Sequence, residues 1–274
     1  MRVLAIDTAL EACAAGVFDL DGCNPVASES RPLGRGHAEA LMPLVARIMD
    51  AAGVDFCDLD RIAVTVGPGS FTGLRVGIAA ARGLALAIGK PAVGVSTLAA
   101  HAAPHRTPEE TRTVVAAIDA HHDLVYFQIF GPDPHDAGAP AVLPAAEAVR
   151  AVPACQAILV GSGAALLAAH WPATLAPPVI DARRVPELTW IARLGAAADA
   201  ETVATIKELI ETRVRPAVAN DGGDITFRGF KDGVVFLNMK GACSGCPSST
   251  ATLRHGIENL LRHFVPDVTE VRAV

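Results

Sequence analysis

Aromatic side chains are scarce in this sequence of 274 residues, which contains 4% Phe, Trp and Tyr and a single tyrosine. Basic residues are also few, because 23 Lys and Arg stand against 29 Asp and Glu. Proteins that bind nucleic acid directly usually combine a basic surface with aromatic rings on which bases stack. We therefore expect any link to RNA to run through a partner protein.

Long uncharged apolar runs are also missing. No segment approaches the roughly 18 uncharged apolar residues that are needed to cross a bilayer. The first residues, MRVLAIDTALEACAAGVFDL, place Asp7, Glu11 and Asp19 where a signal peptide would need an unbroken apolar stretch. These absences predict a cytoplasmic protein, and an apolar content of 51% is sufficient to fill real hydrophobic cores.

A disulfide framework is not indicated either, although the chain has six cysteines. Four of them are solitary and are expected to be mostly small core residues. The other two form a Cys-x-x-Cys motif at Cys243 and Cys246, which in a reducing compartment indicates metal, cluster or redox chemistry. The solitary cysteines are Cys13, Cys23, Cys57 and Cys155.

What is present is a mixed pattern of strands and helices, which predicts an α/β fold. Residues 1–100 are predicted to form one α/β lobe, and residues 101–199 a second lobe with proline-rich loops. The composition changes at 199–201, where an alanine-rich stretch gives way to an amphipathic helix. We therefore predict one domain over 1–199 and a smaller α+β domain over 200–274, with no internal sequence repeat.

The second domain is predicted to contain a helix, a hairpin that turns at 231–233, and a helix that starts near Pro247. The segment GACSGCPSST places both thiols between a strand and a helix N-terminus, where free N–H groups and the helix dipole stabilise thiolates. Three chemistries remain open for Cys243 and Cys246. An iron–sulfur cluster needs four thiolates and therefore two chains, zinc lacks two further ligands at the usual spacing, and a dithiol redox motif needs no further ligand.

Two segments, VRPAVANDGGDITFRGF and GACSGCPSSTATLRHGIENLL, closely resemble the NifU C-terminal (Nfu-type) family of iron–sulfur scaffolds and carriers. The resemblance covers nearly the whole second domain. It implies that Cys243 and Cys246 of two chains hold a [4Fe-4S] cluster at a homodimer interface and that the cluster passes to apo iron–sulfur acceptor proteins. The DGGD residues 221–224 are interpreted as the tight turn into a strand.

A glycine-rich loop, VGPGSFTGLR, follows a predicted strand and opens a helix, which is a common place for anion binding. It lacks the Gly-Lys-Ser/Thr of a Walker loop, since Leu74 and Arg75 follow Gly73, and its glycine spacing does not fit a dinucleotide fingerprint. Gly67, Gly69 and Gly73 are more simply interpreted as allowing a strand to turn sharply into a close-packed helix.

Together, AIDTA, GHAEALMPLV and VGPGSFTGLRVGIAAARGLA are similar to the TsaB (YeaZ) family of the actin-like ATPase superfamily. The resemblance implies two RNase-H-like lobes and a scaffold role in forming tRNA threonylcarbamoyladenosine. It implies a TsaD-like catalytic subunit and a TsaE-like ATPase as partners, with tRNA contacted only indirectly. Related catalytic subunits carry an HxxxH metal pair on the first long helix, but here Leu41 stands four residues after His37, so we expect no catalysis by this chain.

Two further groups of candidate residues accompany this resemblance. Asp7, Gly161 and Gly163 are candidates for contact with a nucleotide or phosphate, although a lone carboxylate at a strand end is more often a turn residue. Helices 38–52 and 74–88 are expected to bind the TsaD-like partner. The main rival hypothesis is an actin-like-fold ATPase or kinase with a thiol-redox or metal-sensing tail, for which the sequence offers no nucleophile and base pair. The predicted interface residues are His37, Leu41, Leu44, Ile48, Leu74 and Ile78.

Overall fold

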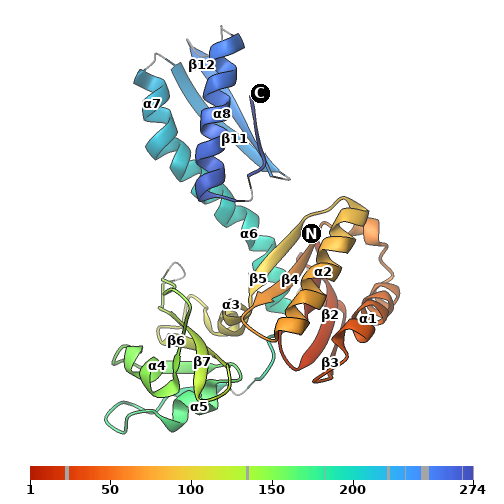
Figure 1. The fold of residues 1–274 in the computed structure, drawn as a ribbon, viewed down its shortest axis with the longest axis vertical. Coiled ribbons are helices and arrows are strands. Elements are labelled where there is room, and N and C mark those ends of the chain that lie inside the picture. Colours follow the sequence, from red (N-terminus) through yellow and green to blue (C-terminus); the bar gives the residue numbers. More distant parts are fainter. Residues whose placement is uncertain are drawn as a thin grey trace. The chain divides into compact units, whose positions relative to one another are not determined.

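The computed structural model describes every residue except 22–24, 134–135, 182, 221–222, 232, 242–246, 267 and 274. It divides into two compact units, Met1–Ala196 and Ala197–Val274 (Figure 1). The boundary expected from the sequence, 199–201, lies a few residues beyond this division. Each unit has its own sheets and hydrophobic core, and the predicted α/β class is confirmed.

The first lobe of the first unit is a five-stranded sheet with helices on both faces. Its elements are β1 (Arg2–Asp7), β2 (Ala12–Asp19), β3 (Pro25–Pro32), α1 (His37–Ala52), the short helix η1 (Phe56–Asp58), β4 (Arg61–Gly67), α2 (Phe71–Ile88) and β5 (Ala92–Ser96). The strand order is β3-β2-β1-β4-β5, in which β1 to β3 are antiparallel and β4 and β5 run parallel to β1. Leu4 and Ile6 of β1 belong to the core under α1 and α2, whereas Val3 and Ala5 face the opposite core.

The second lobe repeats the topology of the first. Its elements are α3 (Thr97–Ala102), the short helix η2 (Ala103–His105), β6 (Thr113–Asp119), β7 (Leu124–Phe130), β8 (Ala141–Pro144), α4 (Ala145–Ala151), β9 (Ala157–Val160), α5 (Ala164–Ala169) and β10 (Val179–Asp181). The order β8-β7-β6-β9-β10 again combines three antiparallel strands with two parallel ones. The sequence shows no internal repeat, so the duplication is visible only in the fold.

The inward side of α1 forms part of the core of its own lobe. Leu41 and Leu44 are each 1% exposed and Ile48 is 4% exposed. The expectation that these three side chains form a partner interface is therefore wrong, because the apolar stripe of α1 is already covered by the sheet. The remaining interface candidates are His37, which is also buried, and Leu74 and Ile78 of α2, which are half-buried.

α2 approaches the sheet closely because its inward side carries glycine. A Cβ atom at Gly73 would lie 2.0 Å from the carbonyl oxygen of Thr8, and one at Gly77 would lie 2.3 Å from Thr8 Oγ1. Thr8 Oγ1 donates a hydrogen bond to the carbonyl oxygen of Gly73 (2.7 Å). At Gly69 a Cβ would lie 2.2 Å from the carbonyl oxygen of Ala9. The interpretation of this loop as a strand-to-helix turn that permits close packing is confirmed.

The outward side of α2 is exposed and partly apolar. Phe71 is 68% exposed and Leu86 is 86% exposed. By length and composition alone, α2 is apolar enough to cross a membrane. It nevertheless carries Arg75 and Arg82, and it lies against β4 and beside α1 on one face of the first sheet (Figure 1). These features are those of a helix that covers a sheet and leaves an apolar outer surface.

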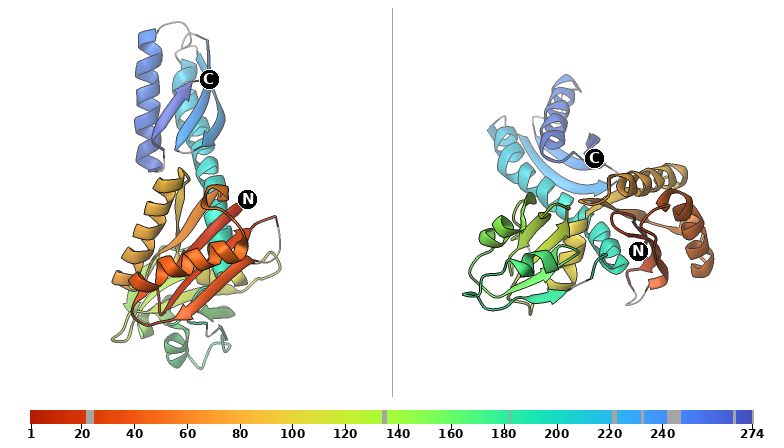
Figure 2. Two further views of the ribbon diagram at one scale, coloured as in Figure 1. Left: turned by 90° about the vertical axis from the view of Figure 1, so that its right-hand side faces the viewer. Right: turned by 60° about the horizontal axis from the view of Figure 1, so that its bottom comes forward.

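The second unit packs its helices on one face of a three-stranded sheet (Figure 2). Its elements are α6 (Leu188–Leu209), which begins in the first unit, the π-helical segment η3 (Ile210–Val214), α7 (Arg215–Asn220), β11 (Gly223–Lys231), β12 (Val234–Gly241), α8 (Pro247–Phe264) and β13 (Glu270–Ala273). The predicted hairpin is β11 and β12, and β13 adds a parallel strand that the sequence analysis did not foresee. α6 begins well before the predicted start at Glu201, since alanine-rich sequence itself favours helix.

Replacing Leu44 with alanine should lower the free energy of unfolding by about 2–5 kcal/mol, because it opens a cavity in the core under α1. The matched control is Met42→Ala on the same helix, whose side chain is 44% exposed and whose loss should cost less than about 0.5 kcal/mol. Urea unfolding of both variants measures the difference. Equal losses would contradict the assignment of Leu44 to the core.

Candidate functional sites

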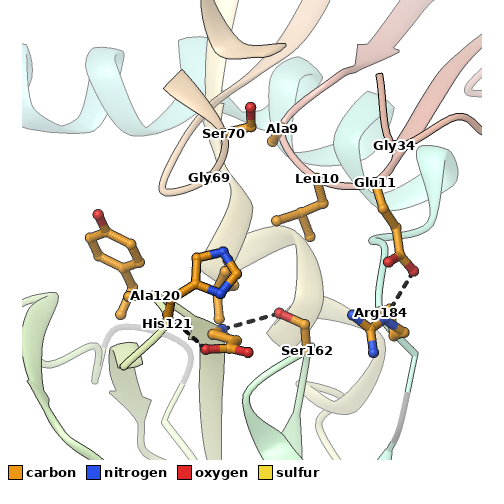
Figure 3. Close-up of a pocket in the computed structure, with 13 residues that line it drawn as sticks. Ala9, Leu10, Glu11, Gly34, Gly69, Ser70, Ala120, His121, Ser162 and Arg184 are labelled. Carbon is orange, nitrogen blue, oxygen red and sulfur yellow. Dashed lines mark hydrogen bonds and ion pairs between the residues drawn. The ribbon is translucent and has the colours of Figure 1, made fainter. Parts of the chain in front are cut away.

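A cleft of about 360 Å³ lies between the two lobes of the first unit (Figure 3). One wall comes from the turn between β1 and β2 and from the loop before α2. The other comes from residues that follow β6 and β9, and an arginine between β10 and α6 lies at the margin. The polar side chains on the cleft include Glu11, Ser70, Asp119, His121, Ser162 and Arg184.

The first wall is held by backbone and hydroxyl contacts. Ser70 N donates to the carbonyl oxygen of Ala9 (2.7 Å), which fixes the loop before α2 against the β1–β2 turn. Ser70 Oγ accepts a hydrogen bond from Gly73 N (3.3 Å) and so caps α2. Because the Ser70 oxygen accepts this bond, its hydroxyl hydrogen remains able to donate.

The second wall is built by a left-handed turn between β6 and β7. His121, His122 and Asp123 have φ angles of 65°, 54° and 62°, a run that is uncommon for residues other than glycine. Asp119 Oδ1 accepts a hydrogen bond from His121 N (2.8 Å), and Asp119 N donates to Ser162 Oγ (3.1 Å). The second of these bonds joins the end of β6 to the turn after β9. All three residues line the cleft, and Figure 3 shows His121 and Ser162 on the same side of it.

An ion pair joins two segments of the cleft that are far apart in sequence. Arg184 Nε lies 2.9 Å from Glu11 Oε1, and both side chains are well exposed. Asp119 adds a second carboxylate. Among the described residues that line the cleft there is no lysine. A polyphosphate would therefore meet two carboxylates and one guanidinium that is already paired, which is unfavourable electrostatically.

Asp7 ends β1 beneath this cleft and is 1% exposed, but it is not part of the lining. Its Oδ1 accepts hydrogen bonds from Thr65 Oγ1 (2.6 Å) and Ala9 N (3.0 Å). Burial raises the pKa of Asp7 above its ordinary value, while these hydrogen bonds and the charge of His37 act in the opposite direction. Asp7 is thus a buried residue that stabilises the turn after β1, and its carboxyl group is not presented to a phosphate.

Gly161 and Gly163 also have a packing role. A Cβ at Gly161 would lie 2.4 Å from the carbonyl oxygen of Ala117, and Gly161 has φ +91°. Gly163 N donates to the same oxygen (2.9 Å). Both glycines let the turn after β9 lie directly on β6, and it is Ser162 between them that lines the cleft. Ser162, Asp119, Glu11 and Arg184 were not predicted from the sequence, although Asp119 ends β6, Ser162 follows β9 and Glu11 directly precedes β2.

His37 begins α1 and is 8% exposed. Leu41, one turn later, is in the core, so the second histidine of an HxxxH pair is replaced by an apolar side chain. In the part of the chain that the structure describes, no group of three or more His, Cys, Asp or Glu side chains is arranged to hold a metal ion.

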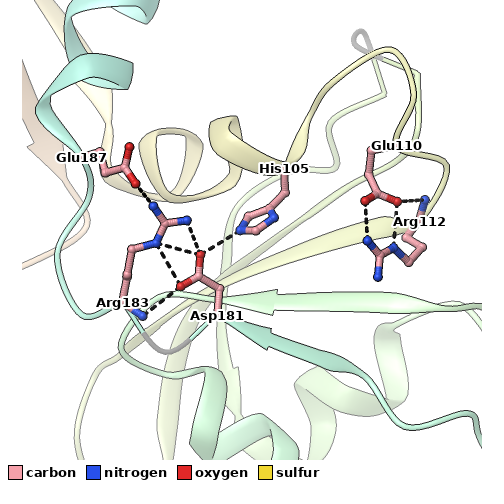
Figure 4. A network of polar contacts seen from close by, with 6 residues as sticks. All are labelled: His105, Glu110, Arg112, Asp181, Arg183 and Glu187. Atoms are coloured by element: carbon pink, nitrogen blue, oxygen red, sulfur yellow. Dashed lines mark hydrogen bonds and ion pairs between the residues drawn. The ribbon is translucent and has the colours of Figure 1, made fainter. Parts of the chain in front are cut away.

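A separate polar network connects η2, β10 and the segment before α6 (Figure 4). Asp181 Oδ2 lies 2.8 Å from both His105 Nε2 and Arg183 Nε, and Arg183 also pairs with Glu187. The hydrogen bonds from Arg183 hold the pKa of Asp181 well below its usual range, although burial opposes them. Because these side chains use their hydrogen-bonding groups and charges on one another, we assign the network a structural role, which is to hold β10 in place.

The cysteine motif lies in the connection between β12 and α8. Cys243 and Cys246 fall within 242–246, outside the described residues. The flanking elements are the predicted strand, which ends at Gly241, and the predicted helix, which begins at Pro247. At the start of β11, Asp224 Oδ1 lies 3.1 Å from Arg215 Nε, which ties α7 to the strand that pairs with the end of β12.

Residues 31–173, just over half of the chain, match the family model described as TsaD: tRNA N6-adenosine threonylcarbamoyltransferase. The chain belongs to the TsaD family. Among solved structures, YeaZ from Pseudomonas aeruginosa is 33% identical with a TM-score of 0.63, and the match covers 73% of this chain and 92% of that one. A crystal structure of an uncharacterized protein with similarity to peptidase YEAZ, also from Pseudomonas aeruginosa, is 32% identical with the same coverage and TM-score. The first unit of this TsaD-family chain is therefore YeaZ-like (TsaB-like) and actin-like in fold.

The second unit matches a different model, the NifU-like domain, over residues 206–272. NifU-like protein 4, mitochondrial, of Arabidopsis thaliana is 63% identical over 75 residues, which are 27% of this chain and 26% of that protein. The human NFU1 iron-sulfur cluster scaffold homolog, mitochondrial, is 48% identical over 90 residues, which are 33% of this chain and 35% of that protein. The chain thus spans only about a quarter to a third of these relatives. Its second unit is a NifU-like domain.

The buried carboxyl group of Asp7 should make stability depend on pH. Its folded-state pKa is raised above the ordinary value of an aspartate, so its stabilising contribution is present below the unfolded pKa and is lost as pH rises through the folded pKa. Asp7→Asn cannot ionise, and its stability relative to the wild type should therefore increase from about pH 3 to about pH 7. Urea midpoints across this range measure the trend, and a constant difference between the two proteins would contradict it.

Proposed function

We propose that the first unit is a non-catalytic scaffold subunit for tRNA N6-threonylcarbamoyladenosine formation. In this role it binds a TsaD-like catalytic subunit, works with a TsaE-like ATPase, and contacts tRNA only through these partners. The second unit carries a [4Fe-4S] cluster as cargo, shared between two copies of the chain, and passes it to apo iron–sulfur proteins. We place both activities in the cytoplasm, where the thiols stay reduced.

The outer side of α2 is the feature that supports a scaffold role most directly. Phe71 and Leu86 are large apolar side chains that remain exposed on a helix anchored to the sheet by Gly73 and Gly77. Exposed apolar surface of this kind is typical of protein–protein contacts. Leu41 replaces the second histidine of the catalytic relatives, which supports an accessory role for this chain. The TsaD-like partner is therefore assigned to the exposed side of α2 rather than to α1.

Replacing Leu86 with glutamate should abolish co-elution of the chain with a TsaD-like subunit. Leu86 is 86% exposed, so the charge would be desolvated in the complex but not in the free protein. The matched control is Val142→Glu on β8 of the other lobe, where the side chain is 50% exposed. Gel filtration measures co-elution, and unchanged unfolding midpoints verify the fold. A Leu86→Glu protein that still co-elutes would move the interface elsewhere.

The Cys-x-x-Cys motif supports the assignment of the cluster to two chains. Each chain contributes only Cys243 and Cys246 in this motif, whereas a four-thiolate cluster needs two such pairs. Of the other thiols, Cys13 is buried in the first unit, and Cys57 and Cys155 are solitary and exposed. A cluster held by two half-sites can be released when the thiols of an acceptor protein replace one pair, which suits a carrier.

Replacing Cys243 or Cys246 with serine should reduce bound iron to near background after anaerobic reconstitution, because serine removes a soft ligand from both halves of the shared site. Helical content should stay nearly unchanged. The matched control is Cys57→Ser, which removes an exposed thiol far from the motif in sequence. Iron and sulfide per chain, together with molecular mass, are the measurements. A full cluster in the Cys243→Ser protein, or a cluster that resides on monomers at all concentrations, would refute the shared site.

A further inference from the structure

The cleft between the lobes has no part in either proposed role. Partner binding uses the outer side of α2, and cluster binding uses the loop between β12 and α8. The cleft is nevertheless a formed cavity of about 360 Å³, with residues from several separate segments of the first unit. This volume lies at the lower end of the range for small-molecule sites, which is about 300–1,000 Å³. A small ligand fits it better than a large one.

Charge selects the kind of ligand. Among the described lining residues, the charged side chains are Glu11, Asp119 and Arg184. An anion is attracted by the guanidinium and repelled by two carboxylates, whereas a simple cation is attracted by the carboxylates and repelled by the guanidinium. A ligand that carries both charges can satisfy both signs. An ammonium group would lie near Asp119 and Glu11, and a carboxylate near Arg184.

Separating the ion pair between Glu11 and Arg184 to admit a ligand costs little free energy. Its atoms are 2.9 Å apart, and the two side chains are 44% and 65% exposed. Exposed pairs of this kind contribute little to stability because water competes with them. Figure 3 shows this pair at the cleft. A zwitterion that enters can separate the pair, with its ammonium taking the place of Arg184 beside Glu11 and its carboxylate taking the place of Glu11 beside Arg184.

One hydroxyl group adds a directed hydrogen bond. Ser162 Oγ accepts a hydrogen bond from Asp119 N (3.1 Å), which fixes its oxygen and leaves its hydroxyl hydrogen able to donate to a carboxylate. The Ser70 hydroxyl points away from Ser162 and Arg184 (Figure 3) and caps α2 instead. Leu10 and Ile118 supply apolar contact for a short side chain.

We propose that this cleft binds a free α-amino acid, with its carboxylate on Arg184 and the Ser162 hydroxyl and its ammonium on Asp119 and Glu11. The site goes beyond the scaffold function and does not depend on it. The cleft therefore serves as a receptor for a small zwitterion rather than for a nucleotide.

Calorimetric titration of the full chain with glycine, L-alanine and L-threonine tests the proposal. At least one of these amino acids should bind saturably, while propionate and propylamine, which each carry one charge, should bind at least about tenfold more weakly. Arg184→Gln and Asp119→Asn should each weaken amino-acid binding by about tenfold or more, the change expected when one charge-assisted hydrogen bond is lost.

The matched control is Arg47→Gln on α1, which breaks an ion pair with Glu29 of β3, outside the cleft. It should bind the amino acid as the wild type does. The proposal is overturned if no amino acid binds, if Arg184→Gln and Asp119→Asn bind as tightly as the control, or if magnesium ATP binds and displaces the amino acid. Co-elution with a TsaD-like subunit is measured on the same variants, so that failure of the cleft site is distinguished from failure of the scaffold function.

Discussion

The first turn of α2 rests directly on the backbone of Thr8 and Ala9, and much of the first unit depends on that contact. Glycine at 69, 73 and 77 removes the side chains that would otherwise hold the helix away from β1. The Thr8 hydroxyl group and the Ser70 amide then close hydrogen bonds across the contact. A Cβ atom at Gly69 or Gly73 would meet a backbone carbonyl oxygen, and one at Gly77 would meet the Thr8 hydroxyl, so the contact tolerates little variation.

Two surfaces with different properties result from this packing. Small residues on the inward side of α2 let the helix lie close to the sheet, while Phe71 and Leu86 on its outward side stay exposed and available to a partner. The same contact brings Ser70 to the cleft and buries Asp7 beneath it. In this chain the carboxyl group at the end of β1 stabilises a turn, and the charges that line the cleft come from Glu11, Asp119 and Arg184.

The second unit is stabilised independently of its cysteine motif. Its helices cover one face of its sheet, and the motif follows β12 in the sequence. Ile225, Val235, Leu237 and Val271 share a single core with the helices, so the fold does not require the thiols. Arg215 and Asp224 fix the start of β11 at the end of the sheet where β12 finishes. This independence of core and motif is the reason that exchange of a cysteine should change iron content without unfolding the domain.

Local patterns in the sequence were sufficient for the α/β class, the close-packing role of Gly67, Gly69 and Gly73, the β11–β12 hairpin and the two family resemblances. Each of these depends on residues adjacent in the chain, where periodicity, turn chemistry and motif spacing act directly. The interface assignment to Leu41, Leu44 and Ile48 was wrong for a related reason. An apolar stripe shows that a helix face is covered, but it does not distinguish cover by the chain's own sheet from cover by a partner.

Only the tertiary structure decided what lines the cleft and which side of α2 is exposed. Glu11 and Arg184 are separated by 173 positions, and Asp119 and Ser162 by 43, yet each pair is in contact. No local pattern encodes these contacts. Asp119 and Ser162 come together because β6 pairs with β9 within the second lobe, and Glu11 meets Arg184 through the packing of the whole first unit. The sequence by itself therefore determined the fold class, most of the elements and the families. Long-range packing decided the pairing of β13 and the placement of charge and exposed apolar surface.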